Sequence, residues 1–252
     1  WANRSVTFAQ PATYTLLANC TDSVGNYNDT MTTNVTIADV TLPTVSVTSP
    51  NGAENITGTV TIAWTAADNV GISNGSLAVE YSDDSGATWT LIEGSLNDTG
   101  SYSWPAAAIN SASVRVRVNV SDAAGNENND SSDADFTVDQ IAPEVTAADT
   151  IFPGQQTMVK NGDTVTLNVS VTATPAGVDN VSINASALGC DENLTMTLTG
   201  ATYLASCIVA GATDGAANLL VRVNDTAGNI NQTTAVTLTV DSTVPEVSDA
   251  AV

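Results

Sequence analysis

The side chains best able to do chemistry in this chain are aspartates, and they occur in a repeated phrase. The phrase Asp-x-x-Gly-Asn begins at Asp22, Asp122 and Asp225, about a hundred residues apart. Carboxylates and carbonyls are the oxygen ligands that Ca²⁺ prefers, so these residues favour divalent-cation binding. The chain carries 27 acidic and 5 basic residues and no histidine, which leaves most carboxylates without a cationic partner.

Catalysis is not expected from this set of residues. Without histidine, neither a Ser-His-Asp triad nor a histidine-bound zinc site can form, and no glycine-rich phosphate loop is present. Residues 82–89 match Ser-x-Asp-x-Gly-x-Thr-Trp, a hairpin device that resembles one found in sialidase propellers. A single copy predicts a turn capped by Asp84 with Trp89 in the core, so we predict no catalytic residue and no enzyme.

The charge balance also limits the partners. A formal net charge of -22 repels the phosphates of nucleic acids and disfavours docking on anionic lipids. No segment approaches the ~20 apolar residues of a membrane span. Only 13% of the residues are charged, and Ser, Thr and Asn supply the polar surface instead. This composition is typical of secreted proteins, and we expect an extracellular or cell-surface location.

Asn-x-Ser/Thr triplets are the second chemical signal, because they accept N-linked glycans. The chain contains fifteen, more than twice the roughly six that chance pairing gives. Asn28, Asn129 and Asn231 follow the repeated turn, which predicts one site present in all three copies. The alternative is that Asn, Ser and Thr are ordinary turn and edge residues. We expect glycans and an archaeal surface; the sites are Asn3, Asn19, Asn28, Asn34, Asn55, Asn74, Asn97, Asn119, Asn129, Asn168, Asn180, Asn184, Asn193, Asn224 and Asn231.

The chain contains three cysteines. Cys190 and Cys207 lie at opposite ends of an expected hairpin that turns near Gly200, so we predict a disulfide between them. Cys20 has no partner in this pairing. The alternative is that all three are reduced core residues.

A fixed spacing between two phrases divides the chain into repeats. Each Asp-x-x-Gly-Asn is followed by Asp-x-x-x-Pro, and the step from the first Asp to the Pro is 21, 21 and 20 residues. A unit of about a hundred residues can bury its own core. We therefore expect the C-terminal part of a first repeat, complete second and third repeats, and the first strand of a following one, at 1–41, 42–141, 142–243 and 244–252.

Period-two alternation predicts strands rather than helices. Residues 114–121 and 165–171 alternate apolar and polar side chains, as strands with one buried and one solvated face do. In the second repeat, strands are expected near 44–48, 59–65, 76–82, 87–92, 100–104, 112–121 and 133–139. In the third, they include 163–172, 218–224 and 234–240. Residues 1–39 supply only the last strands of a unit.

Seven short strands in about a hundred residues are the pattern of an immunoglobulin-like β-sandwich. With its Asp-x-Ala-Gly-Asn turn, its Asp-x-x-x-Pro linker and Trp64 in the second expected strand, the chain resembles tandem immunoglobulin-like, fibronectin type III-like or cadherin-like repeats of prokaryotic surface or filament glycoproteins. The resemblance implies an all-β chain of immunoglobulin-like antiparallel sandwiches arranged end to end. It also implies a spacer, stalk, adhesin segment or filament subunit, and seldom an enzyme.

In such a sandwich, the loops after the second and sixth strands lie where the chain enters, beside the linker aspartate. Three carboxylates meeting there could hold an interdomain Ca²⁺ that stiffens the joint, as in cadherin-like repeats. The alternative is ordinary hairpin chemistry, in which Asp opens a turn and Gly takes the left-handed conformation. The two expected sets are Asp39, Asp68 and Asp122 for the second repeat and Asp139, Asp179 and Asp225 for the third.

The sequence therefore predicts a non-catalytic structural segment of an extracellular glycoprotein that forms a filament, stalk or surface layer. Its expected partners are copies of itself or neighbouring repeats along an axis. One alternative is an adhesin or carbohydrate-binding module that binds surface glycans through Tyr27, Tyr102 or Trp104, although core packing is favoured for Trp104. The other is an accessory segment of a larger secreted enzyme. Ca²⁺ and N-linked glycans are the expected non-protein groups.

Overall fold

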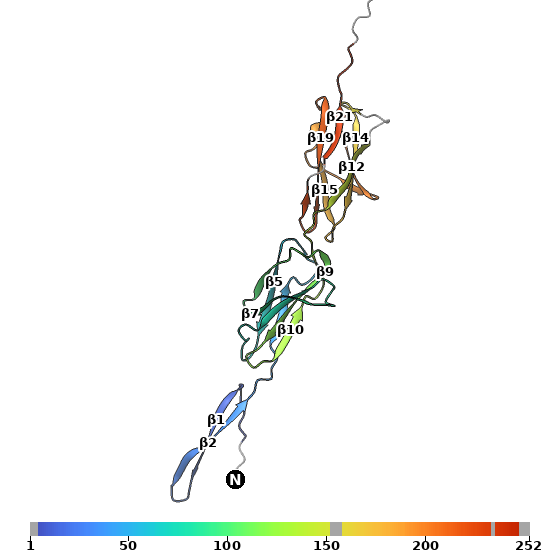
Figure 1. Cartoon of the computed structure of the whole chain (residues 1–252). Helices are drawn as coiled ribbons and strands as arrows, with labels where there is room; N and C mark the ends of the chain where they lie inside the picture. Colours follow the sequence, from blue (N-terminus) through green and yellow to red (C-terminus); the bar gives the residue numbers. More distant parts are fainter. Residues whose placement is uncertain (1–4, 152–157, 233–234, 247–252) are drawn as a thin grey trace, which may run out of the picture.

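A computed structural model of the chain describes residues 5–151, 158–232 and 235–246. Three β units follow one another along a single long axis (Figure 1). Within the described ranges the only helical element is a 3₁₀ turn, η2 (Ser186–Leu188). The described residues contain no helix that is long and apolar enough to cross a membrane. The expected site Asn3 and residues 247–252 of the expected final strand lie outside the described residues.

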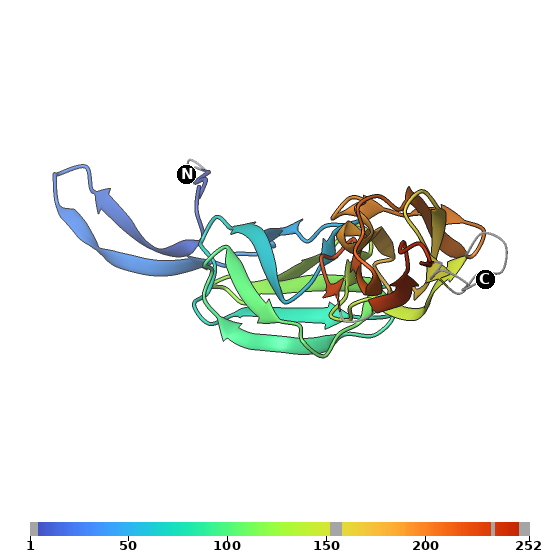
Figure 2. The ribbon, with the colours of Figure 1, turned by 90° about the horizontal axis from the view of Figure 1, so that it is seen from above.

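The first repeat contributes a single hairpin. Its strands β1 (Ala12–Thr21) and β2 (Tyr27–Ile37) pair antiparallel over their whole length. In the described part of the chain no other strand pairs with either, and Figure 2 shows them as a lone ribbon extending from the second repeat. Large apolar side chains are therefore exposed, including Leu17 at 59% and Met31 at 69%.

Two sheets form the second repeat, because its alternating strands each bury one face. One has the order β3-β5-β8, and the other has the order β4-β11-β9-β6-β7, with β10 also paired to β9. The short pair β4–β11 is parallel and the others are antiparallel. The strands are β3 (Thr44–Ser49), β4 (Asn55–Ile56), β5 (Thr59–Ala67), β6 (Leu77–Ser82), β7 (Thr90–Leu96), β8 (Ser101–Pro105), β9 (Ser111–Ser121), β10 (Glu127–Ser131) and β11 (Phe136–Val138).

The core of the second repeat lies between these two sheets. Ile62 of β5 and Val116 of β9 come from opposite sheets and are both fully buried. Trp104 of β8 is only 6% exposed and stacks on Tyr81 with ring centroids 4.9 Å apart, so its expected role in core packing is confirmed. Burial of each such side chain contributes roughly 1.5–3 kcal/mol.

The third repeat has the same plan. One sheet has the order β12-β14-β18-β17, and the other has the order β13-β21-β19-β15-β16, with β20 paired to β19. Here β13 runs parallel to β21, as β4 does to β11. The strands are β12 (Glu144–Ile151), β13 (Met158–Val159), β14 (Thr164–Thr172), β15 (Val178–Asn184), β16 (Leu194–Thr195), β17 (Thr197–Thr199), β18 (Thr202–Ile208), β19 (Gly215–Asp225), β20 (Ile230–Asn231) and β21 (Ala235–Val240).

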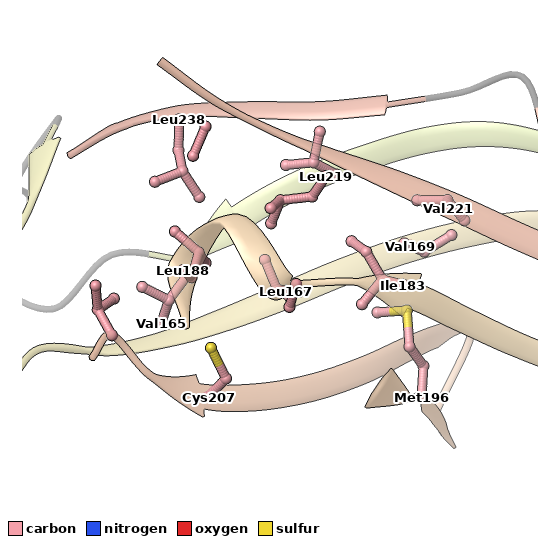
Figure 3. Close-up of a cluster of buried hydrophobic side chains, with 14 of the residues drawn as sticks. Val165, Leu167, Val169, Ile183, Leu188, Met196, Cys207, Leu219, Val221 and Leu238 are labelled. Carbon is pink, nitrogen blue, oxygen red and sulfur yellow. The ribbon is translucent and has the colours of Figure 1, made fainter. Parts of the chain in front are cut away.

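Aliphatic side chains from both sheets of the third repeat meet in one cluster (Figure 3). Leu167 of β14 and Leu219 of β19 are fully buried in it. The predicted disulfide is confirmed, because the Sγ atoms of Cys190 and Cys207 are 2.01 Å apart. Cys207 belongs to the buried cluster, so the disulfide ties the start of the β16–β18 segment to the core. Cys20 is free and exposed.

The strand predictions are confirmed in type and order, but the second repeat has two strands more than expected. One is the two-residue β4. The strand expected at 133–139 is the shorter β11, and an additional strand precedes it, so that β9 pairs with two short strands, β10 and β11. Between them Ser132, which is 1% exposed, takes over part of the ladder: its Oγ accepts a hydrogen bond from the Val116 N–H at 3.1 Å and donates one to the Pro50 carbonyl at 2.9 Å. A serine side chain that replaces a backbone partner cannot be detected from alternation alone.

Candidate functional site

The Asp-x-x-Gly-Asn phrase folds in the same way in all three repeats. In the second repeat, Oδ1 of Asp122 accepts hydrogen bonds at 2.8 Å from the backbone N–H groups of Ala124 and Asn126. Its Oδ2 accepts one from the Nδ2 of Asn126 at 2.7 Å. Asp22 and Asp225 bond in the same way to the asparagines of their own turns. The phrase is thus a self-contained turn built around one carboxylate.

These donors set the charge of Asp122. Burial, which leaves the residue 2% exposed, raises the pKa of its carboxyl group. Hydrogen bonds from the side chain and backbone of Asn126 and from the backbone of Ala124 outweigh that effect, so the pKa lies below its ordinary value of 3.8. The pKa of Asp22 is lowered as well, chiefly by the side chain of Asn26. These carboxylates are therefore charged at neutral pH.

In the two complete repeats, the asparagine of the turn also holds the linker that enters the repeat. The Nδ2 of Asn126 donates to the carbonyl of Asp39 at 3.4 Å, and the Nδ2 of Asn229 donates to that of Asp139 at 3.0 Å. Asparagines two positions further on donate to the linker prolines: Asn128 to Pro43 at 2.8 Å and Asn231 to Pro143 at 3.0 Å. We call this pair of contacts the asparagine clasp. It joins each turn to the linker that precedes its repeat.

At the entry to the second repeat, which we call the first joint, three aspartates come together. Asp39 lies in the linker, Asp68 follows β5 and Asp122 follows β9. Each offers a carboxylate oxygen, and the three oxygens lie within 4.8 Å of one another. The Oδ2 atoms of Asp39 and Asp68 are fully buried, and no protein group donates a hydrogen bond to either. The first predicted set of cation ligands is thus assembled in space.

This arrangement concentrates negative charge that no protein cation compensates among the described residues. A buried acceptor without a donor costs about 1–3 kcal/mol, and more when it is charged, and like charges at this separation repel. The ion pairs among the described residues join Arg115 to Asp135 and Arg117 to Glu80, so no Lys or Arg neutralises the three aspartates. A donor set made only of oxygens suits Ca²⁺ better than zinc or copper.

The second predicted set does not come together. Asp179 lies on β15, where its Oδ2 accepts a hydrogen bond from the Nδ2 of Asn224 at 2.7 Å. Asp139 and Asp225 lie at the entry to the third repeat, the second joint, but the only acidic cluster of metal-binding dimensions in the described residues is that of the first joint. The prediction of a second three-aspartate site is therefore wrong.

Thr174 stands where a third carboxylate was expected. It lies three residues before the left-handed Gly177, as Asp68 lies three before the left-handed Gly71. Both glycine carbonyls accept a hydrogen bond from a backbone N–H in the Asp-x-x-Gly-Asn turn of the same repeat. The hydroxyl of Thr174 donates to Oδ2 of Asp225 at 3.3 Å. Residues 68–70 and 179–181 share the letters Asp-Asn-Val but are not equivalent in the fold. The equivalent loops are marked by their glycines, Gly71 and Gly177.

The second joint is closed by hydrogen bonds between the repeats. The hydroxyl of Thr57 in the second repeat donates to Oδ1 of Asn229 in the third at 2.7 Å. In the linker, the Gln140 N–H donates to Oδ1 of Asn110 at 2.7 Å, and its Oε1 accepts from the Gly58 N–H at 2.8 Å. This joint therefore rests on protein donors and acceptors.

The predicted glycosylation asparagines differ in accessibility. The amide nitrogens of Asn119, Asn224 and Asn231 already donate hydrogen bonds to neighbouring protein oxygens. The half-buried asparagines are Asn119, Asn168, Asn180, Asn184, Asn224 and Asn231. The exposed ones are Asn19, Asn28, Asn34, Asn55, Asn74, Asn97, Asn129 and Asn193.

The expectation of one glycosylation site repeated in all three copies is wrong. Counting six residues from the turn aspartate gives Asn28, Asn128 and Asn231, so Asn129 is not the equivalent position. In both complete repeats this position belongs to the asparagine clasp, with its amide directed at a proline carbonyl. The recurrence of this asparagine is thus explained by linker binding.

The Ser82–Trp89 segment forms the expected capped turn. Asp84 accepts hydrogen bonds from the Ser82 hydroxyl at 2.6 Å and from the N–H and hydroxyl of Thr88 at 2.8 and 2.6 Å. These bonds lower the pKa of Asp84 to about 2. Trp89 is not in the core as expected: it is half-buried, with the Arg117 guanidinium 4.3 Å from its ring centroid. Arg117 alternates with buried valines on β9, which places this pair on the outer face.

The candidate aromatic residues for glycan binding do not form a platform. Trp104 is buried, Tyr102 is half-buried, and Tyr27 is 60% exposed on the separate hairpin of the first repeat. A carbohydrate site of the stacking type needs exposed rings side by side. The geometry therefore gives the carbohydrate-binding alternative no support.

A comparison with protein families agrees with the fold of the second repeat. Residues 43–118 match a family model described as a bacterial Ig domain. No curated protein matches the chain. Similar solved structures include the fibronectin(III)-like modules of Clostridium thermocellum CbhA, with 12% identity, a TM-score of 0.39 and coverage of 82% of this chain and 100% of that one. The Escherichia coli adhesin FdeC gives 15% identity, a TM-score of 0.39 and coverage of 94% and 88%.

A tetra-tandem repeat from the extending region of a large adhesion protein gives 21% identity, a TM-score of 0.32 and coverage of 92% of this chain and 57% of that one. At these values the likeness does not carry function across. With the paired sheets described above, the chain is an all-β array of tandem immunoglobulin-like antiparallel sandwiches arranged end to end.

Proposed function

We propose that this chain is a non-catalytic structural segment of an extracellular glycoprotein that forms a filament, stalk or surface layer. The observation that carries the proposal is the asparagine clasp, which ties the linker of each complete repeat to its own turn so that the repeats continue along one axis (Figure 1). An array in which each repeat contacts only its neighbours gains reach with every unit added. Its partners are neighbouring repeats or copies of itself along the axis.

Electron microscopy of native material tests this function. Fibres, stalks or ordered layers are expected. Separate compact particles, with no extended assembly at any concentration, would contradict it.

The hairpin of residues 1–41 is, in this proposal, the C-terminal part of an immunoglobulin-like repeat. Counted from the turn aspartates, three of its residues are equivalent to valines of β9 that are 0% exposed. These are Tyr14, Leu16 and Ala18, equivalent to Val114, Val116 and Val118, and they are half-buried or exposed. Strands of the same repeat that precede β1 in the full protein would cover this face, as the sheet β3-β5-β8 covers that of β9 in the second repeat.

Hydrogen exchange tests the hairpin assignment. In the 252-residue chain, the amides of β1 and β2 should exchange much faster than those of β9, because no second sheet covers them. Adding the preceding hundred or so residues of the gene should slow their exchange to the level of β9. Unchanged exchange in the longer chain would contradict the assignment.

The first joint is, in this proposal, a Ca²⁺ site with Asp39, Asp68 and Asp122 as ligands. The support is the pair of buried carboxylate oxygens that no protein group satisfies, beside a third carboxylate held ionised by its hydrogen bonds. The ion would neutralise the repulsion and stiffen the joint. Binding at a hundred times Kd stabilises the folded state by about 2.7 kcal/mol.

Thermal melting with and without a chelator tests the Ca²⁺ site. EDTA should lower the melting temperature of the second repeat by several degrees, and excess Ca²⁺ should restore it. An Asp39→Asn variant should show a smaller response to EDTA than the native chain does. Identical melting curves with EDTA and with Ca²⁺ would end this part of the proposal.

Glycans at the exposed asparagines would keep the surface hydrated and shield the strand edges, as expected for an extracellular, archaeal cell-surface protein. Asn34 and Asn119 form a matched pair for comparison, because both lie on strands. Asn34 is exposed, whereas Asn119 is half-buried and its Nδ2 donates a hydrogen bond to Oε2 of Glu80 at 2.8 Å. Peptide mapping of native protein should find a glycan on Asn34 and none on Asn119. An unmodified Asn34 in every peptide would count against glycosylation at the exposed sites.

A further inference from the structure

We infer that the residue three places before the loop glycine, Asp68 in the second repeat and Thr174 in the third, decides whether a joint requires a cation. The inference rests on the Ca²⁺ site of the proposed function and extends it to the difference between the two joints. Its basis is a comparison of the donors that reach each carboxylate oxygen.

At the second joint, protein groups satisfy every oxygen of the two aspartates. The backbone N–H of Ala176 donates to Oδ2 of Asp139 at 2.9 Å, and that of Ile141 donates to Oδ1 at 3.0 Å. Asp225 accepts from the backbone and side chain of Asn229 and from the Thr174 hydroxyl. Asp139 is 0% exposed, and buried polar groups are stable when they are hydrogen-bonded in this way.

At the first joint, the equivalent donor is turned elsewhere. Val70 occupies the place of Ala176, one residue before the loop glycine, but its N–H donates to Oδ1 of Asp68 at 2.8 Å. Because one backbone N–H serves only one acceptor well, the Val70 N–H is no longer available to the linker aspartate, Asp39. The Oδ2 atoms of Asp39 and Asp68 are both left buried without a donor.

An aspartate at this position therefore changes the joint in three ways. It adds a negative charge, it removes the hydroxyl that a threonine would donate to the turn aspartate, and it diverts the N–H that would satisfy the linker aspartate. All three changes increase uncompensated negative charge in a buried place, which is costly. A bound divalent cation would compensate for all three changes, whereas the joint with threonine needs no cation.

Calorimetric titration with Ca²⁺ in ~0.15 M salt, where isolated surface carboxylates are largely screened, tests the inference on the full chain. The native chain should bind one ion, Asp68→Thr none, and Thr174→Asp two. Thr174→Asn, which changes the side chain without adding charge, is the matched control and should bind one. A Thr174→Asp chain that still binds one ion, or an Asp68→Thr chain that still binds Ca²⁺ as the native chain does, overturns the inference.

Melting in EDTA separates this inference from the proposed Ca²⁺ site and also detects a variant that fails to fold. A native chain that binds no Ca²⁺ would overturn the proposed site itself. The inference is then decided without metal: Asp68→Thr should raise the melting temperature of the second repeat, and Thr174→Asp should lower that of the third. Unchanged or opposite shifts would overturn it.

Discussion

Reduction of the Cys190–Cys207 disulfide should destabilise the third repeat by about 3 kcal/mol. The bond closes a loop with a sequence separation of 17 residues, and the loss of loop entropy in the unfolded chain predicts a stabilisation of about 3 kcal/mol for that length. Reduction leaves the side-chain atoms in place, so no cavity is created beside Leu167 and Leu188. For a unit of about a hundred residues, each kcal/mol lowers the melting temperature by about 4–8 °C, so the shift should exceed about 10 °C.

The distribution of tryptophan allows the two complete repeats to be followed separately. Trp64, Trp89 and Trp104 all lie in the second repeat and the third has none. In a chain with Trp1→Phe and Cys20→Ser, the latter to prevent dimers through the exposed thiol, tryptophan fluorescence reports the second repeat alone. Circular dichroism reports both. A reducing agent should shift the dichroism transition of the third repeat and leave the fluorescence transition unchanged.

Two results would refute the reasoning on the disulfide. A reduced third repeat that melts within about 4 °C of the oxidised one would show that the bond contributes less than about 1 kcal/mol. A tryptophan transition that moves equally with reduction would show that the repeats do not unfold independently. A chain in which both cysteines are serine is the control, because a reducing agent should not affect its melting.

Two further predictions concern the second repeat. The pKa of Asp84 in the folded state is about 2, so its charged form stabilises the fold above the ordinary pKa of 3.8, and this stabilisation is lost as the pH falls toward 2. In urea unfolding between pH 2 and 6, the free energy of unfolding should fall less steeply with pH for Asp84→Asn than for the native chain. Parallel pH curves for the two chains would contradict this. Gly125→Ala should lower the free energy of unfolding by about 1–2 kcal/mol. An added Cβ would meet nothing within 4 Å, so the cost comes from the backbone, which has φ +90°. Gly94→Ala is the control, because Gly94 is equally open but has no positive φ, and an equal effect of both substitutions on the urea midpoint would refute the conformational argument.

Much of this architecture follows from local rules that the sequence obeys. Alternation in β9 and β14 predicts both the strands and their buried faces, because period two has one structural meaning in a sandwich. The disulfide follows from two cysteines that flank a hairpin. The first aspartate set follows from topology, since the linker and two loops meet at one end of the unit.

The failures share a physical cause, which is competition for hydrogen bonds. The sequence predicts Asp179 at the second joint, but the loop before β15 ends at Gly177 and Asp179 lies on β15. Ser132 lies between β10 and β11, where its hydroxyl accepts a hydrogen bond from the backbone of β9. Asn128 and Asn231 recur because they bind linker carbonyls. Each outcome depends on which donor reaches which acceptor in three dimensions, and spacing along the chain does not specify it.

The negative charge of the chain acts on its joints far more than on its cores. The cores of the two complete repeats are aliphatic and aromatic, and their stability comes from area removed from water, which responds little to moderate salt. A net charge of -22 spread along an extended array repels itself, and that repulsion is screened over about 10 Å at 0.1 M salt. A joint closed by neutral hydrogen bonds should hold its geometry as salt varies, whereas the proposed Ca²⁺ site would tie the stiffness of the first joint to the cations around it.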